Sequence, residues 1–254
     1  MTRLIISSWV LALLLGAAPV YSQAPKCLTV GRAQMAEALG APELAKWLTL
    51  EAATCNELVM SGVGVGFKLG ENTSPVYGGN RTEVAVDFPF NEGDTVRYSW
   101  QMKLPADFVG DPLNRWWLLA QWHDQPDKRL GETWAGFASR SPPVAIYTEQ
   151  RNGVVGIGLI FNGNDKRSWV KVPLGEWLDL SITIHWRTQG DGEVTFDIVG
   201  YPEFQFKTKG KTMHNAYQHY LKFGQYRHKS NRIESIAFFR SLSIDKITPV
   251  LDKP

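Results

Sequence analysis

Most of the chain after residue 60 alternates between apolar and polar positions, the pattern of strands with one buried and one wet face. In the segment 95–103, Val96, Tyr98, Trp100 and Met102 alternate with polar residues. Turn-forming pairs such as Asn162-Gly163 separate neighbouring segments. We expect strands at 63–69, 81–88, 95–104, 115–123, 144–149, 154–161, 178–186, 193–199, 204–208, 220–226 and 233–244.

Many short antiparallel strands at this spacing predict an all-β fold, either a sandwich or a jelly roll. No internal repeat or low-complexity linker interrupts them. We therefore expect a single concanavalin-like β-jelly roll sandwich over residues 61–254.

Residues 25–60 have a different pattern. The segments 33–39 and 43–58 are rich in Ala, Leu and Glu at helical spacing, with an interruption at Gly40-Ala41-Pro42. They predict two or three short helices. We expect a short N-terminal helical extension that covers one edge of a sheet.

The first residues have the features of an export signal. Met1-Thr2-Arg3 precedes an apolar run over 4–20, and small residues follow at 22–24. A membrane anchor is the alternative, but Pro19 and the polar residues 21–23 end the run in the manner of a cleavage site. The segment 1–24 is therefore predicted to be a signal peptide, and the mature protein to be secreted or periplasmic without a membrane partner.

The two cysteines, Cys27 and Cys55, lie close together in sequence. Export permits a disulfide between them, which would stabilise the fold by about 3–4 kcal/mol in the chain-entropy model. Two unpaired thiols or a catalytic cysteine are the alternatives. Without clustered histidines they make no zinc site.

Charge and aromatic content narrow the class of partner. The formal net charge of +2 is too balanced to indicate a nucleic-acid partner, although a local basic groove for an acidic polymer remains open. Ten tryptophans and eight tyrosines offer flat surfaces for sugar rings. Trp117 shares an alternating face with Arg115, Gln121 and His123, so it either lines such a groove or sits in the core. A monomer is expected.

Three short strings place reactive side chains on shared strand faces. They are Arg81-Thr82-Glu83, Gln121-Trp122-His123 and the segment 220–226, YLKFGQY. Because side chains alternate, one face of each strand carries the following groups: Arg81 with Glu83, Gln121 with His123, and Tyr220 with Lys222 and Tyr226.

These side chains match the needs of β-elimination on a uronic-acid polymer. That reaction removes the C5 proton beside the carboxylate and expels the 4-O substituent. Arg81 and Gln121 are suitable donors to the carboxylate. His123 is a suitable base, and Tyr226 can act as acid or, once ionised, as base.

In this order the strings resemble the motif strands of jelly-roll alginate lyases. The sequence around them, over about residues 60–245, is similar to the glucuronan-lyase and heparin-lyase-like group of polysaccharide lyases. Phe223 and Trp122 differ from the alginate-lyase pattern, which favours another uronate polymer. The strings with this similarity are Gln121-Trp122-His123-Asp124, Ser141-Pro142-Pro143-Val144-Ala145-Ile146, Leu174-Gly175-Glu176-Trp177 and Tyr220 to Arg227.

The resemblance implies roles for these positions. Arg81 and Gln121 would hold the substrate carboxylate, with His123 as base and Tyr226 as acid, or Tyr226 in both roles when the elimination is syn. Lys222 would support the site or bind a neighbouring uronate, and Glu83 would orient Arg81. Further substrate contacts are expected from Trp117, Arg115, Tyr220, Arg227 and His228.

Simpler interpretations stand beside these roles. Arg81 and Glu83 could form an exposed ion pair worth under about 1 kcal/mol, His123 could be a hydrogen-bonded strand-end residue, and Lys222 a surface lysine. A non-catalytic, lectin-like jelly roll would use the same groove only to hold glycan. A retaining glycoside hydrolase needs two close carboxylates, and Glu83 has no acidic residue two positions later.

The predicted chemistry requires no cofactor. The loop residues Asp124, Asp127, Asp165 and Asp191 lack the dense oxygen spacing of a calcium loop, so a structural calcium ion has no support beyond their presence. The sequence thus predicts a secreted polysaccharide lyase for an acidic polysaccharide, without a metal.

Overall fold

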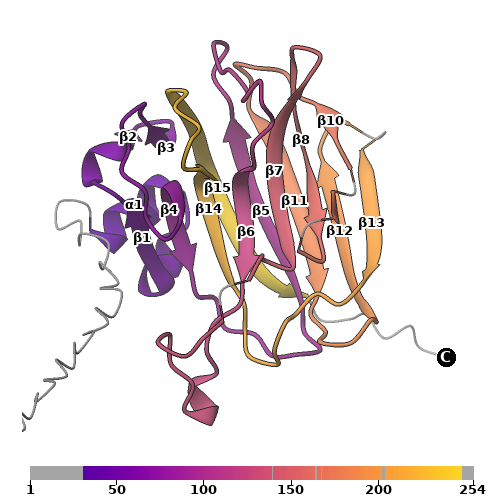
Figure 1. Ribbon diagram of the computed structural model, residues 1–254. Helices are drawn as coiled ribbons and strands as arrows, with labels where there is room; N and C mark the ends of the chain where they lie inside the picture. The colour runs from indigo at the N-terminus through magenta and orange to yellow at the C-terminus, as the bar shows by residue number, and fades with distance from the viewer. Residues whose placement is uncertain (1–30, 139, 164, 167, 202–203, 248–254) are drawn as a thin grey trace, which may run out of the picture.

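Two antiparallel β-sheets pack face to face in the computed structural model, which describes residues 31–138, 140–163, 165–166, 168–201 and 204–247 (Figure 1). The predicted signal peptide 1–24 lies outside these residues. So does Cys27, and with it the predicted Cys27–Cys55 bridge. In the described residues no helix is both long and apolar enough to cross a membrane.

The sheet that carries the motif strings, here called sheet A, has eight strands with β14 and β6 near its middle. All its pairings are antiparallel, and the short β9 pairs with β8 beside the main path. The order is β1 (Leu48–Ala52), β4 (Gly79–Val86), β14 (Tyr220–His228), β6 (Trp117–His123), β7 (Val144–Arg151), β8 (Val154–Phe161) and β10 (Val170–Lys171), with β9 at Asp165–Lys166.

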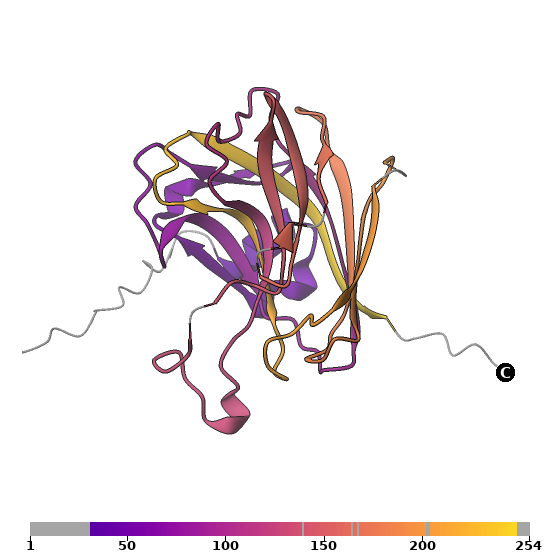
Figure 2. The ribbon, with the colours of Figure 1, turned by 45° about the vertical axis from the view of Figure 1, so that its right-hand side comes forward.

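The second sheet, sheet B, has seven strands and lies behind sheet A, as the turned view shows (Figure 2). Its order is β13 (Gln205–Gly210), β12 (Gly192–Ile198), β11 (Leu178–His185), β5 (Thr95–Lys103), β15 (Ser235–Ile247), β3 (Gly64–Leu69) and β2 (Leu58–Ser61). The predicted all-β sandwich is confirmed.

The core lies between the sheets and is rich in aromatic side chains. Trp100 and Tyr98 from β5 meet Trp122 from β6, with the Tyr98 and Trp122 ring centroids 5.2 Å apart. Each buried aromatic side chain of this size removes a large apolar area from water and dominates core energetics. The alternation of β5 and β11 is confirmed, because their apolar residues are buried and their polar residues face outward.

The N-terminal segment is only partly helical. A helix forms at α1 (Arg32–Ala38), and short 3₁₀ turns form at η1 (Pro42–Trp47) and η2 (Cys55–Glu57). The helical prediction for 43–58 is only partly right, because η1 and η2 are separated by β1, and β1 and β2 extend sheets A and B. Backbone pairing of β1 with β4 outweighs the helical propensity of its Leu, Glu and Ala residues. The segment is therefore part of the sandwich.

The connection between β6 and β7 forms an arm that projects away from the sandwich and carries η3 (Lys128–Leu130) (Figures 1 and 2). Its base is fixed by Arg140, which pairs with the buried Asp124 directly after β6. Trp134 on the arm is 56% exposed and lies 6.4 Å, centroid to centroid, from Tyr220 of β14. The arm thus places an exposed aromatic ring beside the outer face of sheet A.

Candidate active site

Four polar side chains on the outer face of sheet A, here called the cluster, are almost excluded from water. Arg81 and Glu83 on β4 are 4% and 0% exposed, and Gln121 on β6 and Lys222 on β14 are 2% and 6% exposed. Buried charges are costly unless they are paired. This burial distinguishes the cluster from the wet face that alternation alone would predict.

Glu51 from β1 completes the cluster. Its Oε2 accepts from Arg81 Nη1 at 2.7 Å and from Lys222 Nζ at 2.8 Å. Glu83 lies 3.4 Å from Arg81 Nη1 through Oε2, and its Oε1 accepts from Gln121 Nε2 at 2.7 Å. Arg81 and Gln121 therefore both contact Glu83, and four neighbouring strands meet in one polar network.

Burial and pairing move the pKa values in this network in opposite directions. Desolvation raises the pKa of Glu83, although Arg81 and Lys222 act against it. For Glu51 desolvation is outweighed by Lys222 and Arg81, so its pKa is lowered. Desolvation acts to lower the pKa of Lys222, but Glu51, Tyr220 and Glu83 together outweigh it and raise that pKa. Glu51 and Lys222 thus remain a charged pair at neutral pH.

One end of the cluster carries an imidazole and a phenol. His123 and Tyr220 are register partners on β6 and β14, with ring centroids 6.0 Å apart. His123 Nδ1 lies 2.7 Å from the carbonyl oxygen of Asp124. Because a carbonyl only accepts, Nδ1 is assigned as the donor and Nε2 keeps the lone pair that a general base needs.

Asp124 adds charge behind that imidazole. Its Oδ1 lies 3.1 Å from His123 Nδ1 but makes no hydrogen bond, while Oδ2 pairs with Arg140. Burial opposes ionisation of Asp124, yet His123 and Arg140 outweigh it and lower its pKa. An ionised carboxylate there would stabilise an imidazolium after proton uptake.

The other end of the cluster carries Tyr226. Its ring lies over the Arg81 guanidinium, 3.8 Å from Cζ, and packs edge-on against Trp116 at 4.7 Å. Its hydroxyl donates to the carbonyl of Tyr77 at 2.9 Å. Tyr77 has a left-handed backbone with φ of 49°, an unfavourable conformation for this residue that is often found at functional sites.

His123 and Tyr226 are not neighbours. Tyr226 pairs with Leu118 of β6, five residues before His123, which is ~16 Å along the strand at ~3.3 Å per residue. The two groups therefore stand at opposite ends of the buried cluster. A polymer lying along β6 and β14 would meet the imidazole at one end of the cluster and the phenol at the other.

A bulge in β14 positions Tyr226. The register with β6 shifts between Phe223 and Tyr226, and Gly224 within it has φ of +131°. A Cβ on Gly224 would lie 2.4 Å from the carbonyl oxygen of Thr82 and 2.8 Å from a ring carbon of Phe67. Glycine is needed here both for the backbone conformation and for the close approach of β4.

Gly224→Ala is expected to destabilise the protein by about 1–3 kcal/mol, the cost of a residue held in a sparsely populated backbone region. Chemical denaturation with urea should show a lower midpoint at an unchanged slope. Gly153→Ala provides the matched control, because Gly153 also has positive φ but a Cβ there meets nothing within 4 Å. Equal destabilisation by both changes would contradict the close-approach argument.

Two predicted substrate contacts are wrong. Trp117 is 1% exposed and packs in the core against Phe108, 5.2 Å between centroids. A register shift between Leu118 and Ala120 breaks the strict alternation of β6, so Trp117 does not share the face of Gln121 and His123. Arg227 also faces inward, fully buried, and donates to Ile233, Ser235 and Gly70.

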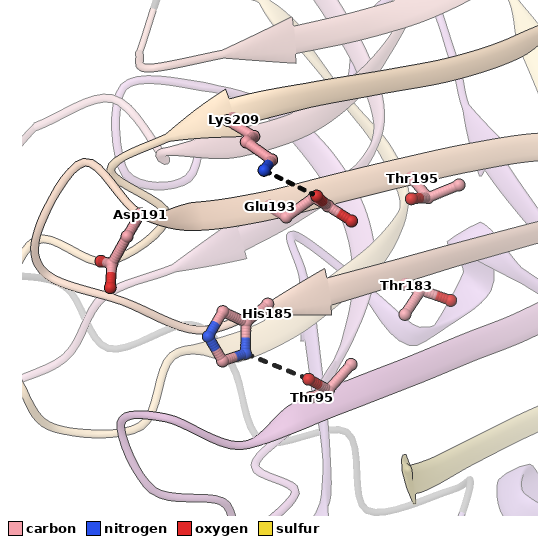
Figure 3. A pocket seen from close by; sticks show the side chains of 7 residues that line it. All are labelled: Thr95, Thr183, His185, Asp191, Glu193, Thr195 and Lys209. Carbon is pink, nitrogen blue, oxygen red and sulfur yellow. Dashed lines mark hydrogen bonds and ion pairs between the residues drawn. The ribbon is translucent and has the colours of Figure 1, made fainter. Parts of the chain in front are cut away.

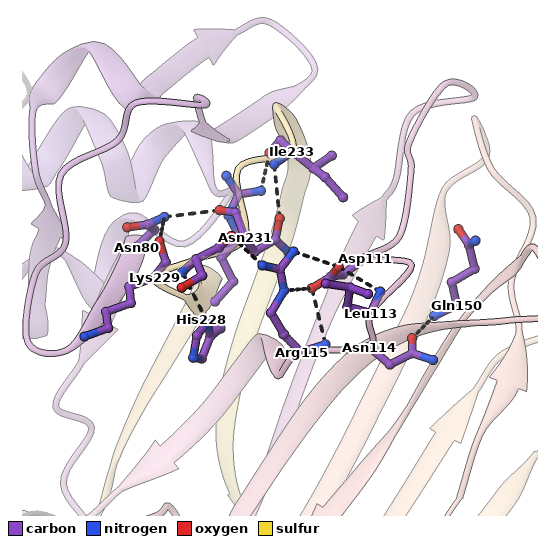
Figure 4. A network of polar contacts seen from close by, with 12 residues as sticks. Asn80, Asp111, Leu113, Asn114, Arg115, Gln150, His228, Lys229, Asn231 and Ile233 are labelled. Carbon is purple, nitrogen blue, oxygen red and sulfur yellow. Dashed lines mark hydrogen bonds and ion pairs between the residues drawn. The ribbon is translucent and has the colours of Figure 1, made fainter.

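Arg115 has a structural contact that the sequence did not predict. It lies in the loop before β6 and forms a salt bridge with Asp111, Nε to Oδ2 2.6 Å, while Nη1 donates to the carbonyl of Ser230 (Figure 4). This network joins the loop to the turn after β14, where His228 receives backbone support from Trp116. His228 remains on the outer face, 5.9 Å from the Trp116 ring.

The site contains residues that sequence reasoning missed. Glu51 was hidden in a segment predicted to be helical. Asp124 carries a local signal, because it directly follows His123 in the motif, but the sequence assigns it no role beside the imidazole. Trp116 and Trp134, 38% and 56% exposed, had no pattern to separate them from core tryptophans.

A second polar hollow lies on the outer face of sheet B (Figure 3). There His185 hydrogen-bonds to Thr95 at 3.1 Å, and Glu193 pairs with Lys207 and Lys209. Sheet B separates these groups from the motif strands of sheet A. Among the described residues, no group of three or more His, Cys, Asp or Glu side chains is arranged to hold a metal ion.

Comparisons with known proteins agree with this fold. A family profile described as "Polysaccharide lyase" matches residues 51–247. Among solved structures, the chain is similar to an endo-β-1,4-glucuronan lyase from the fungus Trichoderma reesei, with 14% identity and a TM-score of 0.53 over 78% of this chain and 86% of that one. It is also similar to alginate lyase Aly36B (12% identity, TM-score 0.57, 86% of this chain and 91% of that one).

A third similar structure is a variant of the family 7 alginate lyase A1-II′ in complex with product (GGG). It has 13% identity and a TM-score of 0.55 over 76% of this chain and 85% of that one. The comparison with curated proteins gives no match. At these identities the solved structures support the jelly-roll fold, and the profile match covers most of the chain.

Proposed function

Because the chain belongs to the polysaccharide lyase family and is thereby a carbon–oxygen lyase, we propose that it cleaves a uronic-acid polysaccharide by β-elimination. The products would carry 4,5-unsaturated uronate ends. The observation that carries this proposal is the pair of buried cations, Arg81 and Lys222, beneath a face that also presents His123, Tyr220 and Tyr226.

The buried cations suit the charge that develops in this reaction. Removal of the C5 proton spreads negative charge onto the adjacent carboxylate. Fixed positive groups in a water-excluded site stabilise such charge far more than they would in water. Glu51 and Glu83 already contact Arg81. Arg81 therefore acts on the substrate carboxylate either through its electric field or after releasing one of these two carboxylates.

We assign His123 as base and Tyr226 as acid. In an anti elimination, proton removal and leaving-group protonation occur on opposite faces of one sugar, so both side chains would have to reach that sugar from the two ends of the cluster. Tyr226 acting alone, as in a syn elimination, is the second arrangement. Trp134 and Trp116 lie beside the two ends, where they would stack on neighbouring sugars.

The choice of polymer is open between glucuronan-like and alginate-like chains. The sequence differences at Trp122 and Phe223 do not bear on it, because both side chains lie in the core. We favour glucuronan or a related polymer on the wider similarity of the strings.

We also propose export with removal of residues 1–24, which the mass of the mature protein would test.

Incubation with separate uronic polymers tests the proposed activity. We expect ultraviolet absorbance from the 4,5-unsaturated product to rise with glucuronan, alginate, a heparin-type polymer or a pectic polymer, and not with a neutral glucan. Binding of these polymers without any absorbance would instead identify a lectin-like jelly roll. Mass spectrometry of the products should show no added water, which excludes hydrolysis.

A further inference from the structure

Glu51 joins the two buried cations of the site through a single oxygen. Its Oε2 lies 2.7 Å from Arg81 Nη1 and 2.8 Å from Lys222 Nζ, so β1, β4 and β14 converge on one carboxylate. The three side chains are 16%, 5% and 7% exposed. Solvent therefore screens these contacts weakly, unlike surface ion pairs.

Without Glu51, the repulsion between the Arg81 and Lys222 charges would be less well balanced by negative charge. Lys222 is a flexible side chain, and its ammonium is held by Glu51 and lies 5.0 Å from the ring centroid of Tyr220. Arg81 would keep Glu83, which is itself shared with Gln121. Glu51 is thus the group that sets the spacing between Lys222 and Arg81.

The neighbours of Lys222 determine how it would respond. The charged and titratable groups that face it are Glu51 from β1, Arg81 and Glu83 from β4, and Tyr220 from its own strand, while β6 presents the neutral amide of Gln121. Burial favours the neutral amine, and Glu51 is the largest influence that favours the ammonium. Loss of the Glu51 charge should therefore lower the pKa of Lys222.

We propose that Glu51 is a positioning residue of the active site, which fixes Lys222 and Arg81 beneath the reacting sugar. This inference rests on the proposed function for its catalytic consequence. It makes the N-terminal strand β1 part of the catalytic structure.

Glu51→Gln tests the proposal, because it removes the charge and keeps the shape. We expect kcat to fall about 10²-fold, the order of loss caused by misplaced active-site groups. NMR titration of labelled lysine side chains should show the pKa of Lys222 lowered by about 1–3 units, as expected when an opposite charge is lost. Lys222→Met identifies its resonance.

Glu193→Gln is the matched control. Glu193 also bridges two lysines, Lys207 at 2.6 Å and Lys209 at 3.9 Å, but on the exposed face of sheet B. It should leave both kcat and the Lys222 titration unchanged. Glu51→Asp keeps the charge on a shorter side chain, and we expect it to lower kcat while Lys222 titrates nearly as in the wild type.

A wild-type rate and an unchanged Lys222 titration in Glu51→Gln would overturn the proposal. If that variant does not fold, Glu51→Asp decides, since an unchanged kcat would contradict a positioning role. Failure of the proposed function has a different signature: the wild-type protein would then act on none of the polymers, while the titration would still report whether Glu51 controls Lys222.

Discussion

Replacing Tyr226 by Phe is expected to lower kcat by ~10²- to 10⁴-fold, the range for loss of a general acid–base group. The phenol hydroxyl is the group that would protonate the leaving 4-oxygen. The ring itself should stay in place, because it packs on Arg81 and Trp116. Initial rates from product absorbance, with thermal unfolding measured in parallel, would separate lost chemistry from lost structure.

Tyr220→Phe is the informative comparison for that variant. Tyr220 lies on the same strand but beside His123, and we assign it to substrate binding, so its loss should raise KM more than it lowers kcat. Tyr217→Phe should have no effect on either constant, because the Tyr217 ring packs against Arg129 of the arm, 5.0 Å from its guanidinium carbon. A Tyr226→Phe enzyme with full activity beside an inactive Tyr220→Phe enzyme would move the acid role to the His123–Tyr220 pair.

Loss of the imidazole is the second change with a large expected effect. His123→Ala should lower kcat by ~10²- to 10⁴-fold, because no other described side chain at that end of the cluster has a lone pair in the same position. Initial rates from product absorbance, with thermal unfolding measured in parallel, would measure this loss.

His185→Ala is the control for this change. His185 lies on a strand with the same alternation, but it faces the outer side of sheet B and bonds to Thr95 (Figure 3). We expect wild-type turnover from it. Comparable losses in His123→Ala and His185→Ala would point to a general effect on folding and would remove His123 from the mechanism.

The sequence predicted long alternating strands well, and the reason is physical. Strands such as β5 and β11 have one face in the core and one in water, so hydrophobicity reports their geometry directly. The segment of β1 carries no comparable signal. Its five residues include Leu, Glu and Ala, which favour helices in isolation, and only the pairing with β4 makes it a strand.

The site was predicted in its parts but not in its arrangement. Strand parity paired Arg81 with Glu83, Gln121 with His123, and Tyr220 with Lys222 on one face of each strand, and only the family resemblance brought the three strands together. Parity failed at Trp117, because a bulge changes the parity of β6 and a bulge without glycine leaves little trace in a sequence. Alternation also assigns outer faces to water, so it could not show that this face buries four polar side chains.

The ion pair between β1 and β14 links residues 171 positions apart, from near the start of the described chain to near its end. Contacts of such long sequence separation form late and slow the folding of β proteins. During synthesis, Glu51 emerges long before Lys222, so this ion pair cannot form until almost the whole chain exists. Competence for catalysis would then arise only when the sandwich closes, which keeps incomplete chains inactive.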